Sequence, residues 1–252
     1  MTAHPTTPTT NPTTTTSYAA WPTQVRLPGQ TAAHEGPVDM TMMYVMHHAF
    51  RRDLAAFAAA AAATPVEARS TWRALAERWE TFAHALHHHH TGEDTGLWPL
   101  LEERTDDAGR ETLAAMEVEH GEIDPILTAC AAGFERLASH ADEDARAALA
   151  VRLVAARESL GRHLRHEECD AIALIQELLT NEEWHALDEE HFKKGLSIQR
   201  LLTQVPWALH EVPAPIRRDL FAQPGGRAHH AMWLATRRPF ERRERLAFRY
   251  VG

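Results

Sequence analysis

Histidines and carboxylates recur at helical spacing in the middle of this 252-residue chain. The sequence holds 18 histidines, and four of them interrupt apolar patterns whose steps of three and four residues would otherwise face a core. Two are followed one turn later by a glutamate, in the pairs His89/Glu93 and His163/Glu167. Residues i and i+4 project from one face of a helix, and a buried carboxylate is costly unless it is paired or binds a metal. The spacing therefore indicates metal ligands.

The candidate ligands are the histidines and carboxylates that continue these apolar stripes. Asp124 is included because it follows His120 by one turn, on the flank of the same stripe. The complete set is His47, His89, Glu93, His120, Asp124, His163 and Glu167. Four imidazoles and three carboxylates exceed what one ion needs, and they suit two ions bridged by carboxylates inside a helical bundle.

The neighbouring polar residues are not expected to be ligands. In the histidine run that ends at His90, only His89 continues its stripe, so His90 is expected to face solvent or to lie beside the ligands. His166 is likewise expected to face solvent or to lie beside the ligands. Either His90 or His166 could act as an acid or base, but no catalytic residue is assigned. The two cysteines, Cys130 and Cys169, fit neither a thiolate metal site nor a disulfide framework.

Amphipathic helices are the elements that must position these side chains. Apolar residues at alternating steps of three and four predict helices over 40–61, 65–97, 113–137 and 149–174. Thr64 and Glu67 form a potential capping box for the second helix, and Thr180 forms one for a fifth helix that ends near Lys194. Sustained period-two alternation is absent from the sequence. Short connections then favour an all-α fold, an up-down-up-down antiparallel four-helix bundle.

Composition divides the chain into three parts. Residues 1–37 are rich in Thr and Pro and lack periodicity, so a disordered N-terminal segment is expected. Residues 38–180 hold the predicted bundle. Residues 181–252 hold the fifth helix and an irregular or helical C-terminal extension that packs back onto the bundle. Gly92 and Gly96 fall inside the second predicted helix, where each costs about 1 kcal/mol relative to Ala, but the apolar stripe continues past them.

Charge and hydropathy exclude some classes of partner. The net charge of −9 argues against nucleic-acid binding. The longest apolar run, residues 54–63, is about half of what a membrane span needs, so no membrane association is predicted. A start without an apolar leader and the low cysteine content together favour a cytoplasmic location.

The ligand pattern resembles that of the hemerythrin-like, cation-binding HHE family. That family places a histidine in helix one, His-x-x-x-Glu in helix two, a histidine in helix three and His-x-x-x-Glu/Asp in helix four. The matching segments are HHAFRR (47–52), HHTGEDTGLWP (89–99), EHGEID (119–124) and HLRHEE (163–168). The resemblance covers about residues 39–179, and the tail looks like the C-terminal extension of actinobacterial members.

This chain departs from the oxygen-carrying hemerythrins at two positions. Those proteins place a second histidine one turn after the ligand of helix three, where this chain has Asp124. A carboxylate there makes a harder ligand set that favours the ferric state. Family members also differ in the spacing of the last carboxylate, which leaves Glu167 and Glu168 as alternatives. We favour Glu167 because it lies on the apolar stripe.

The resemblance implies a non-haem diiron protein that binds a small diatomic ligand or peroxide: dioxygen, nitric oxide or peroxide. Two carboxylate-bridged irons are expected, with manganese or zinc less favoured, and the role would lie in the oxidative or nitrosative stress response or in iron or oxygen sensing. One alternative is a diiron enzyme with catalase-like or NO-processing activity. Another is a metal-responsive interaction module whose arginine-rich tail contacts a protein partner.

Overall fold

The computed structural model of the protein describes residues 21–251, and all regular structure in that range is helical. The predicted all-α class is therefore confirmed for the described residues. Predicted disorder over residues 1–20 lies outside them. None of the helices in the described part of the chain combines the length and hydropathy that a membrane span requires.

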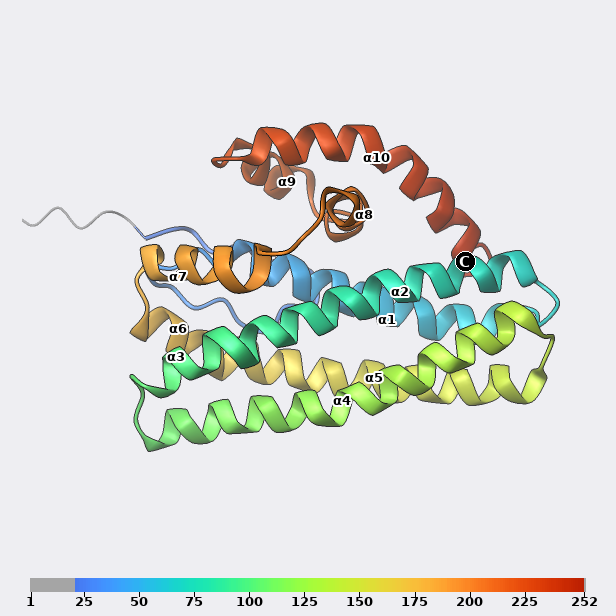
Figure 1. The fold of residues 1–252 in the computed structure, drawn as a ribbon, viewed down its shortest axis with the longest axis horizontal. Coiled ribbons are helices and arrows are strands. Elements are labelled where there is room, and N and C mark those ends of the chain that lie inside the picture. The colour runs from blue at the N-terminus through green and yellow to red at the C-terminus, as the bar shows by residue number, and fades with distance from the viewer. Residues whose placement is uncertain (1–20, 252) are drawn as a thin grey trace, which may run out of the picture.

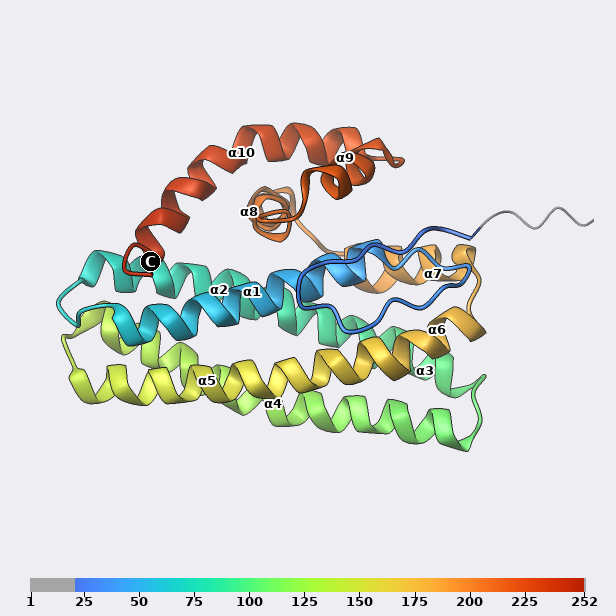
Figure 2. The same ribbon diagram turned by 180° about the vertical axis from the view of Figure 1, so that it is seen from behind.

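Four long helices lie side by side and run alternately back and forth, as Figures 1 and 2 show. They are α1 (Thr41–Ala63), α2 (Arg69–Gly92), α4 (Asp107–Ser139) and α5 (Glu143–His166). Helix α1 packs against α5 and α2, and α4 packs against α2 and α5. The side chains of Asp106 and Asp142 accept hydrogen bonds from the first turns of α4 and α5, which ends the loops that precede these helices.

Two of the long helices continue through π-helical turns. Helix α2 runs into η1 (Glu93–Leu97) and α3 (Trp98–Glu102), while α5 runs into η2 (Glu167–Ala171) and α6 (Ile172–Leu178). The second predicted helix thus continues past its glycines, as expected. A π-helical turn holds one residue more per hydrogen-bonded ring than an α-helical turn, and such turns are frequent at functional sites.

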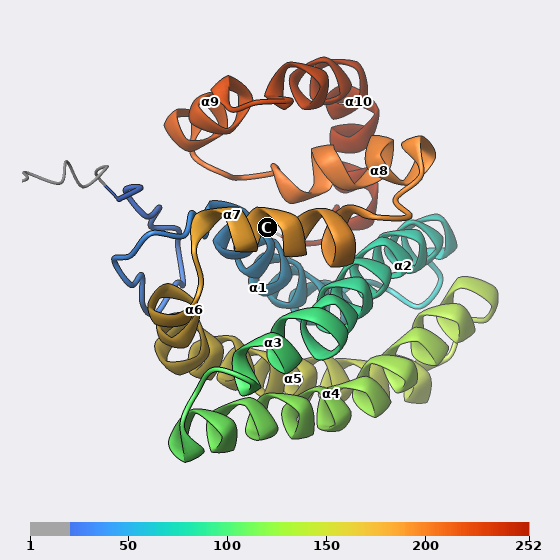
Figure 3. The same ribbon diagram turned by 60° about the vertical axis from the view of Figure 1, so that its left-hand side comes forward.

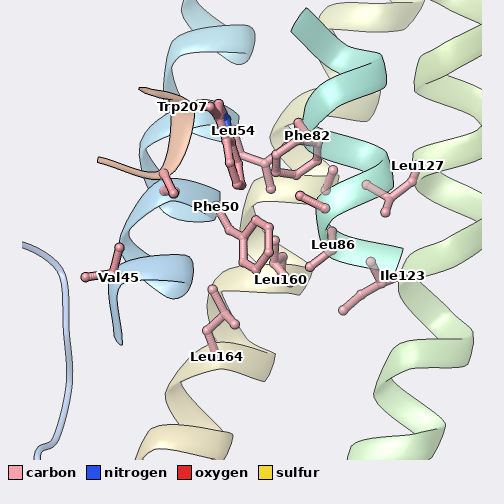
Figure 4. Close-up of a cluster of buried hydrophobic side chains, with 14 of the residues drawn as sticks. Val45, Phe50, Leu54, Phe82, Leu86, Ile123, Leu127, Leu160, Leu164 and Trp207 are labelled. Carbon is pink, nitrogen blue, oxygen red and sulfur yellow. The ribbon is translucent and has the colours of Figure 1, made fainter. Parts of the chain in front are cut away.

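An apolar core fills the space between the long helices. Figure 4 shows Phe50 and Leu54 of α1 pointing toward Phe82 of α2, with Ile123 of α4 and Leu160 of α5 beside them. The rings of Phe50 and Phe82 meet edge to face, with their centroids 5.9 Å apart, a favoured arrangement for aromatic pairs. Apolar side chains of all four long helices therefore meet in one buried cluster.

The predicted start of the second helix is wrong by four residues. Thr64 does not cap it: its backbone N–H donates to Ala60 O and ends α1, and α2 begins at Arg69. Pro65 lies in the turn between them and accepts a hydrogen bond from Trp72 Nε1. The second predicted capping box is confirmed, because Thr180 and Glu183 cap α7 (Asn181–Leu187), which continues as η3 (Asp188–Lys193).

The described part of the N-terminal segment, residues 21–37, is irregular but packed, which corrects the expectation of disorder there. The side chain of Gln24 donates to Val38 O and accepts from Met40 N, and Leu27 is buried. Thr31 N donates to the carboxylate of Glu168. These long-range contacts order a stretch whose composition alone predicts an unstructured chain.

The C-terminal extension is helical and lies over α1 and α2, as Figure 3 shows. It comprises α7, η3, α8 (Ile198–Ala208), α9 (Ala214–Ala222) and α10 (Gly226–Ala247). Trp207 of α8 is fully buried, and its Nε1 donates to Asp53 Oδ2 at 2.8 Å. Asp53 also binds Arg52 and Arg78 at 2.7–3.0 Å. A buried ionic cluster therefore joins the extension to α1 and α2.

We predict that acid loosens the extension through His210. Burial and then the nearby Arg52 guanidinium lower the pKa of this imidazole from 6.5 to about 4. A pKa lowered in the folded state gives stability that is complete above the unfolded-state value and is lost as the pH falls from about 6.5 toward 4. Between about pH 7 and 5, the thermal midpoint of the wild type should fall more steeply than that of His210→Gln. Replacing the exposed His185 with glutamine is the control, and equal slopes for wild type and His210→Gln would contradict the prediction.

Candidate metal centre

Two adjacent groups of buried side chains lie among α1, α2, α4 and α5. The first group is His47, His89, Glu93 and Glu167, and the second is His90, His120 and His163. In each group, one potential ligand atom per residue lies within 4.8 Å of all the others. All seven residues are at most 4% exposed. Such a concentration of polar groups in an apolar core needs a physical reason.

The two glutamates connect the two groups. Glu93 places Oε1 3.0 Å from His89 Nε2 and Oε2 3.6 Å from His120 Nε2. Glu167 places Oε2 3.2 Å from His47 Nε2 and 3.7 Å from His163 Nε2. Each carboxylate therefore faces one histidine in each of the two groups. A carboxylate that bridges two cations must lie in such a position.

The inward-facing atoms of the first group lack hydrogen-bond partners. These atoms are Nε2 of His47, Nε2 of His89 and both carboxylate oxygens of Glu93 and of Glu167. Their close contacts with one another do not have hydrogen-bond geometry. An unsatisfied buried polar group costs about 1–3 kcal/mol, so six such atoms together would be strongly destabilising. Cations bound between them remove this cost, and the residues present fit metal ions.

Outer carboxylates orient three of the histidines. Nδ1 of His47 donates to Glu168 at 3.0 Å, Nδ1 of His120 to Asp94 at 2.8 Å, and Nδ1 of His163 to Glu119 at 2.8 Å. These hydrogen bonds leave Nε2 of each ring facing the centre. The arrangement is typical of a metal-binding histidine, which donates its other N–H to a carboxylate or carbonyl.

The structure separates the roles of the two consecutive glutamates after His163. Glu167 reaches the first group, whereas Glu168 lies behind His47. Arg51 Nη1 and Thr31 N each donate to Glu168 at 2.7 Å. Its charge is thus already neutralised by other partners, and the favoured candidate, Glu167, is the one that lies in the centre.

Burial and neighbouring charges together shift the pKa values of the centre in the absence of a cation. Burial and then the neighbouring His47 lower the pKa of His89 to about 3. Burial and the adjacent Glu167 carboxylate raise the pKa of Glu93 well above its ordinary value. Burial opposes the charged form of His47, but Glu167 and Glu168 outweigh it and raise its pKa to about 9. A cation must therefore displace the proton of His47, while His89 is ready to bind.

Local helix geometry brings the two ligand pairs inward. Glu93 and Glu167 are each the first residue of a π-helical turn, η1 and η2 respectively. The i, i+4 spacing keeps each glutamate on the face of its preceding histidine. This spacing is visible in the sequence and predicts the two pairs, whereas the sequence carries no signal for the π-helical turns that follow them.

Six of the seven predicted ligands lie in the two groups, and one does not. Asp124 is exposed on α4, so its inclusion in the centre is corrected. The neighbouring Ile123 is the residue that points inward. His90 is corrected in the opposite direction: it is buried and belongs to the second group. His166 is partly exposed and donates from Nδ1 to Glu119 at 2.9 Å.

The glycines of the second predicted helix make room for the extension. A Cβ atom on Gly92 would lie 2.7 Å from the Phe192 ring, and one on Gly96 would clash with His191. We predict that Gly96→Ala lowers the free energy of unfolding by about 1–3 kcal/mol through overpacking. Gly161 is the control, because an added Cβ atom there would meet nothing within 4 Å. Gly161→Ala should raise the free energy of unfolding by up to about 1 kcal/mol. Urea unfolding measures both, and a stabilised Gly96→Ala variant would refute the prediction.

The fold and the two ligand groups define a class: an all-helical protein with a buried histidine–carboxylate centre able to hold metal cations. Residues 39–175, more than half of the chain, match the hemerythrin HHE cation-binding domain. The chain therefore belongs to the hemerythrin HHE family. No curated protein and no solved structure matches it.

Proposed function

We propose that the centre binds two iron ions and, through them, a small oxidant or gas: dioxygen, peroxide or nitric oxide. The supporting observation is that Glu93 and Glu167 each face one histidine in each group and have no hydrogen-bond partner. The proposal also takes α1, α2, α4 and α5 as the predicted antiparallel four-helix bundle, with the centre in its interior.

In this proposal His47 and His89 would hold one iron, His120 and His163 would hold the other, and the two glutamates would be available to both. Bound iron supplies a redox-active metal at which a small ligand coordinates. Glu168, Asp94 and Glu119 hold the imidazoles in place through the hydrogen bonds to Nδ1.

Apolar side chains isolate the proposed centre from bulk water. Phe50 lies 5.3 Å from the His89 ring, centroid to centroid, and is fully buried. Leu86, Ile123 and Leu160 lie nearby in the same buried cluster (Figure 4). A small uncharged ligand crosses such a layer at a lower desolvation cost than an ion does, which favours a gas or peroxide over a charged substrate.

The donor set favours iron over the alternatives. Zinc is almost always four-coordinate in structural sites, and manganese prefers carboxylate and water oxygens. The centre instead offers imidazole nitrogens and carboxylate oxygens together, in a number that exceeds one tetrahedral ion. Mixed imidazole–carboxylate sets are typical of non-haem iron.

Anaerobic loading with Fe(II) tests the proposal. We expect about two irons per chain after desalting, and a new near-ultraviolet absorption band when peroxide, dioxygen or nitric oxide is added. Stoichiometric consumption of the ligand indicates a binding protein, and repeated turnover indicates the alternative of an enzyme. Protein that retains at most traces of iron would refute a diiron function.

A second candidate, a metal-responsive interaction module, is favoured by one group of contacts. The centroid of the His89 ring lies 6.1 Å from that of Phe192 in the extension. The Phe50 ring contacts both His89, at 5.3 Å, and Trp207 of the extension, at 5.7 Å. Metal binding at His89 would then stabilise the extension. Hydrogen exchange in residues 181–251 should slow on iron loading; unchanged exchange would exclude this candidate.

A further inference from the structure

We propose that His90 is the third imidazole ligand of the second cation, together with His120 and His163. This inference rests on the proposed two-cation centre and extends it to a residue that the apolar stripe of α2 does not include. It predicts that the two cations have different ligand sets.

His90 is buried without hydrogen bonds. It is 4% exposed, and neither Nδ1 nor Nε2 has a hydrogen-bond partner. A histidine that served only to fill the core would be expected to satisfy at least one of its nitrogens. A buried nitrogen without a partner is unfavourable, and coordination of a cation removes that cost at one of the two nitrogens.

The His90 ring lies against the rings of His120 and His163. His90 stacks on His120 with a centroid separation of 3.8 Å and an interplanar angle of 10°, and its centroid lies 5.3 Å from that of His163. The Nε2 atoms of His120 and His163 are 3.1 Å apart. Two nitrogens bound at right angles to one ion, each with a bond of about 2.1 Å, lie about 3 Å apart. His120 and His163 therefore already have the spacing of neighbouring ligands, and a nitrogen of His90 lies within 4.8 Å of both.

Two consecutive residues of α2, His89 and His90, both face the centre. Successive residues of an α-helix point about 100° apart, and α2 packs against α1 on one side and α4 on another. His89 accordingly meets His47 of α1, with ring centroids 5.4 Å apart, while His90 meets His120 of α4. The dipeptide thus contributes one imidazole to each group.

The two groups then differ in composition. The first group has two histidines and two glutamates, whereas the second has three histidines and no carboxylate of its own. The Nε2 atoms of His120 and His163 instead face Glu93 and Glu167 of the first group. His90 takes the place that Asp124, exposed on α4, does not fill. Loss of His90 should therefore weaken the binding of the cation in the second group and leave the cation in the first group bound.

The test compares His90→Gln with His87→Gln, because His87 belongs to the same histidine run but is exposed. Each variant is loaded anaerobically with Fe(II), desalted and assayed for iron and protein, and circular dichroism checks that it folds. We expect about two irons per chain in the wild type and in His87→Gln, and about one in His90→Gln. Calorimetric titration with Fe(II) should show the loss of one of two binding events.

The outcomes separate this inference from the proposed function. Fewer than two irons in the wild type would refute the two-iron centre itself. Two irons in the wild type and an unchanged second binding event in His90→Gln would overturn the role of His90 alone. Should His90→Gln not fold, X-ray absorption on the iron-loaded wild type decides: about five imidazoles per two irons support the inference, and about four refute it.

Discussion

Replacing Glu93 with glutamine is expected to abolish iron binding, reducing the content from about two irons per chain to less than about half an iron. Glu93 is fully buried and faces a histidine of each group. Glutamine keeps the size of the side chain but removes the charge that bridges two cations, so both irons should be lost rather than one. The iron-to-protein ratio after anaerobic loading and desalting measures this effect.

The same substitution should have opposite effects on the metal-free and the iron-loaded protein. Without metal, the Glu93 carboxyl has no hydrogen-bond partner and burial raises its pKa. Folding must therefore either bury its charge or protonate it, and a neutral amide avoids that cost. With iron at about a thousand times its dissociation constant, the wild type gains about 4 kcal/mol that the variant cannot gain. Glu158→Gln, at an exposed position of α5, is the matched control. Retention of two irons by Glu93→Gln would contradict both expectations.

Asp53→Ala is expected to lower the free energy of unfolding by about 3–5 kcal/mol, because it breaks a buried ionic cluster. Asp53 is 1% exposed; burial opposes its ionisation, but Arg78, Arg52 and Trp207 together outweigh burial and lower its pKa. Its removal leaves buried Arg78 without that partner and the Trp207 Nε1 donor without an acceptor. Urea unfolding, followed by circular dichroism, measures the loss.

Because Asp53 joins α1 to the extension through Trp207, the effect should be largest in residues 181–251. Hydrogen exchange there should become faster in Asp53→Ala than in the wild type. Glu158→Ala removes an exposed carboxylate from another helix and should change the free energy of unfolding by less than about 0.5 kcal/mol. A loss in Asp53→Ala as small as in this control would mean that the cluster does not hold the extension.

Helical periodicity predicted most of the centre because its ligands occupy core positions. The residues that share a stripe with large apolar side chains, such as His47 with Phe50, must point inward wherever the helix packs. The structure therefore brings together His47, His89, Glu93, His120, His163 and Glu167. Apolar spacing also predicted the α-helical class and the helix that continues through Gly92 and Gly96.

Periodicity failed at the edges of the stripes. Asp124 and His90 both lie beside a stripe, and each has the same ambiguous helical phase in the sequence. The outcome depends on whether a neighbouring helix covers that flank: α4 covers the flank of α2 at His90, whereas Asp124 is exposed. The prediction of disorder over residues 21–37 is wrong for a related reason. The contacts that order this segment come from distant residues such as Glu168.

The sequence by itself determined the type of ligand and its helical phase: histidine and glutamate one turn apart, on stripes that must be buried. Only the tertiary structure decided how those stripes combine, by making Glu93 and Glu167 face both groups and by placing His90 beside His120. The physical reason is that periodicity along one helix specifies which face is apolar, while the angles and distances between helices specify which side chains of different helices meet.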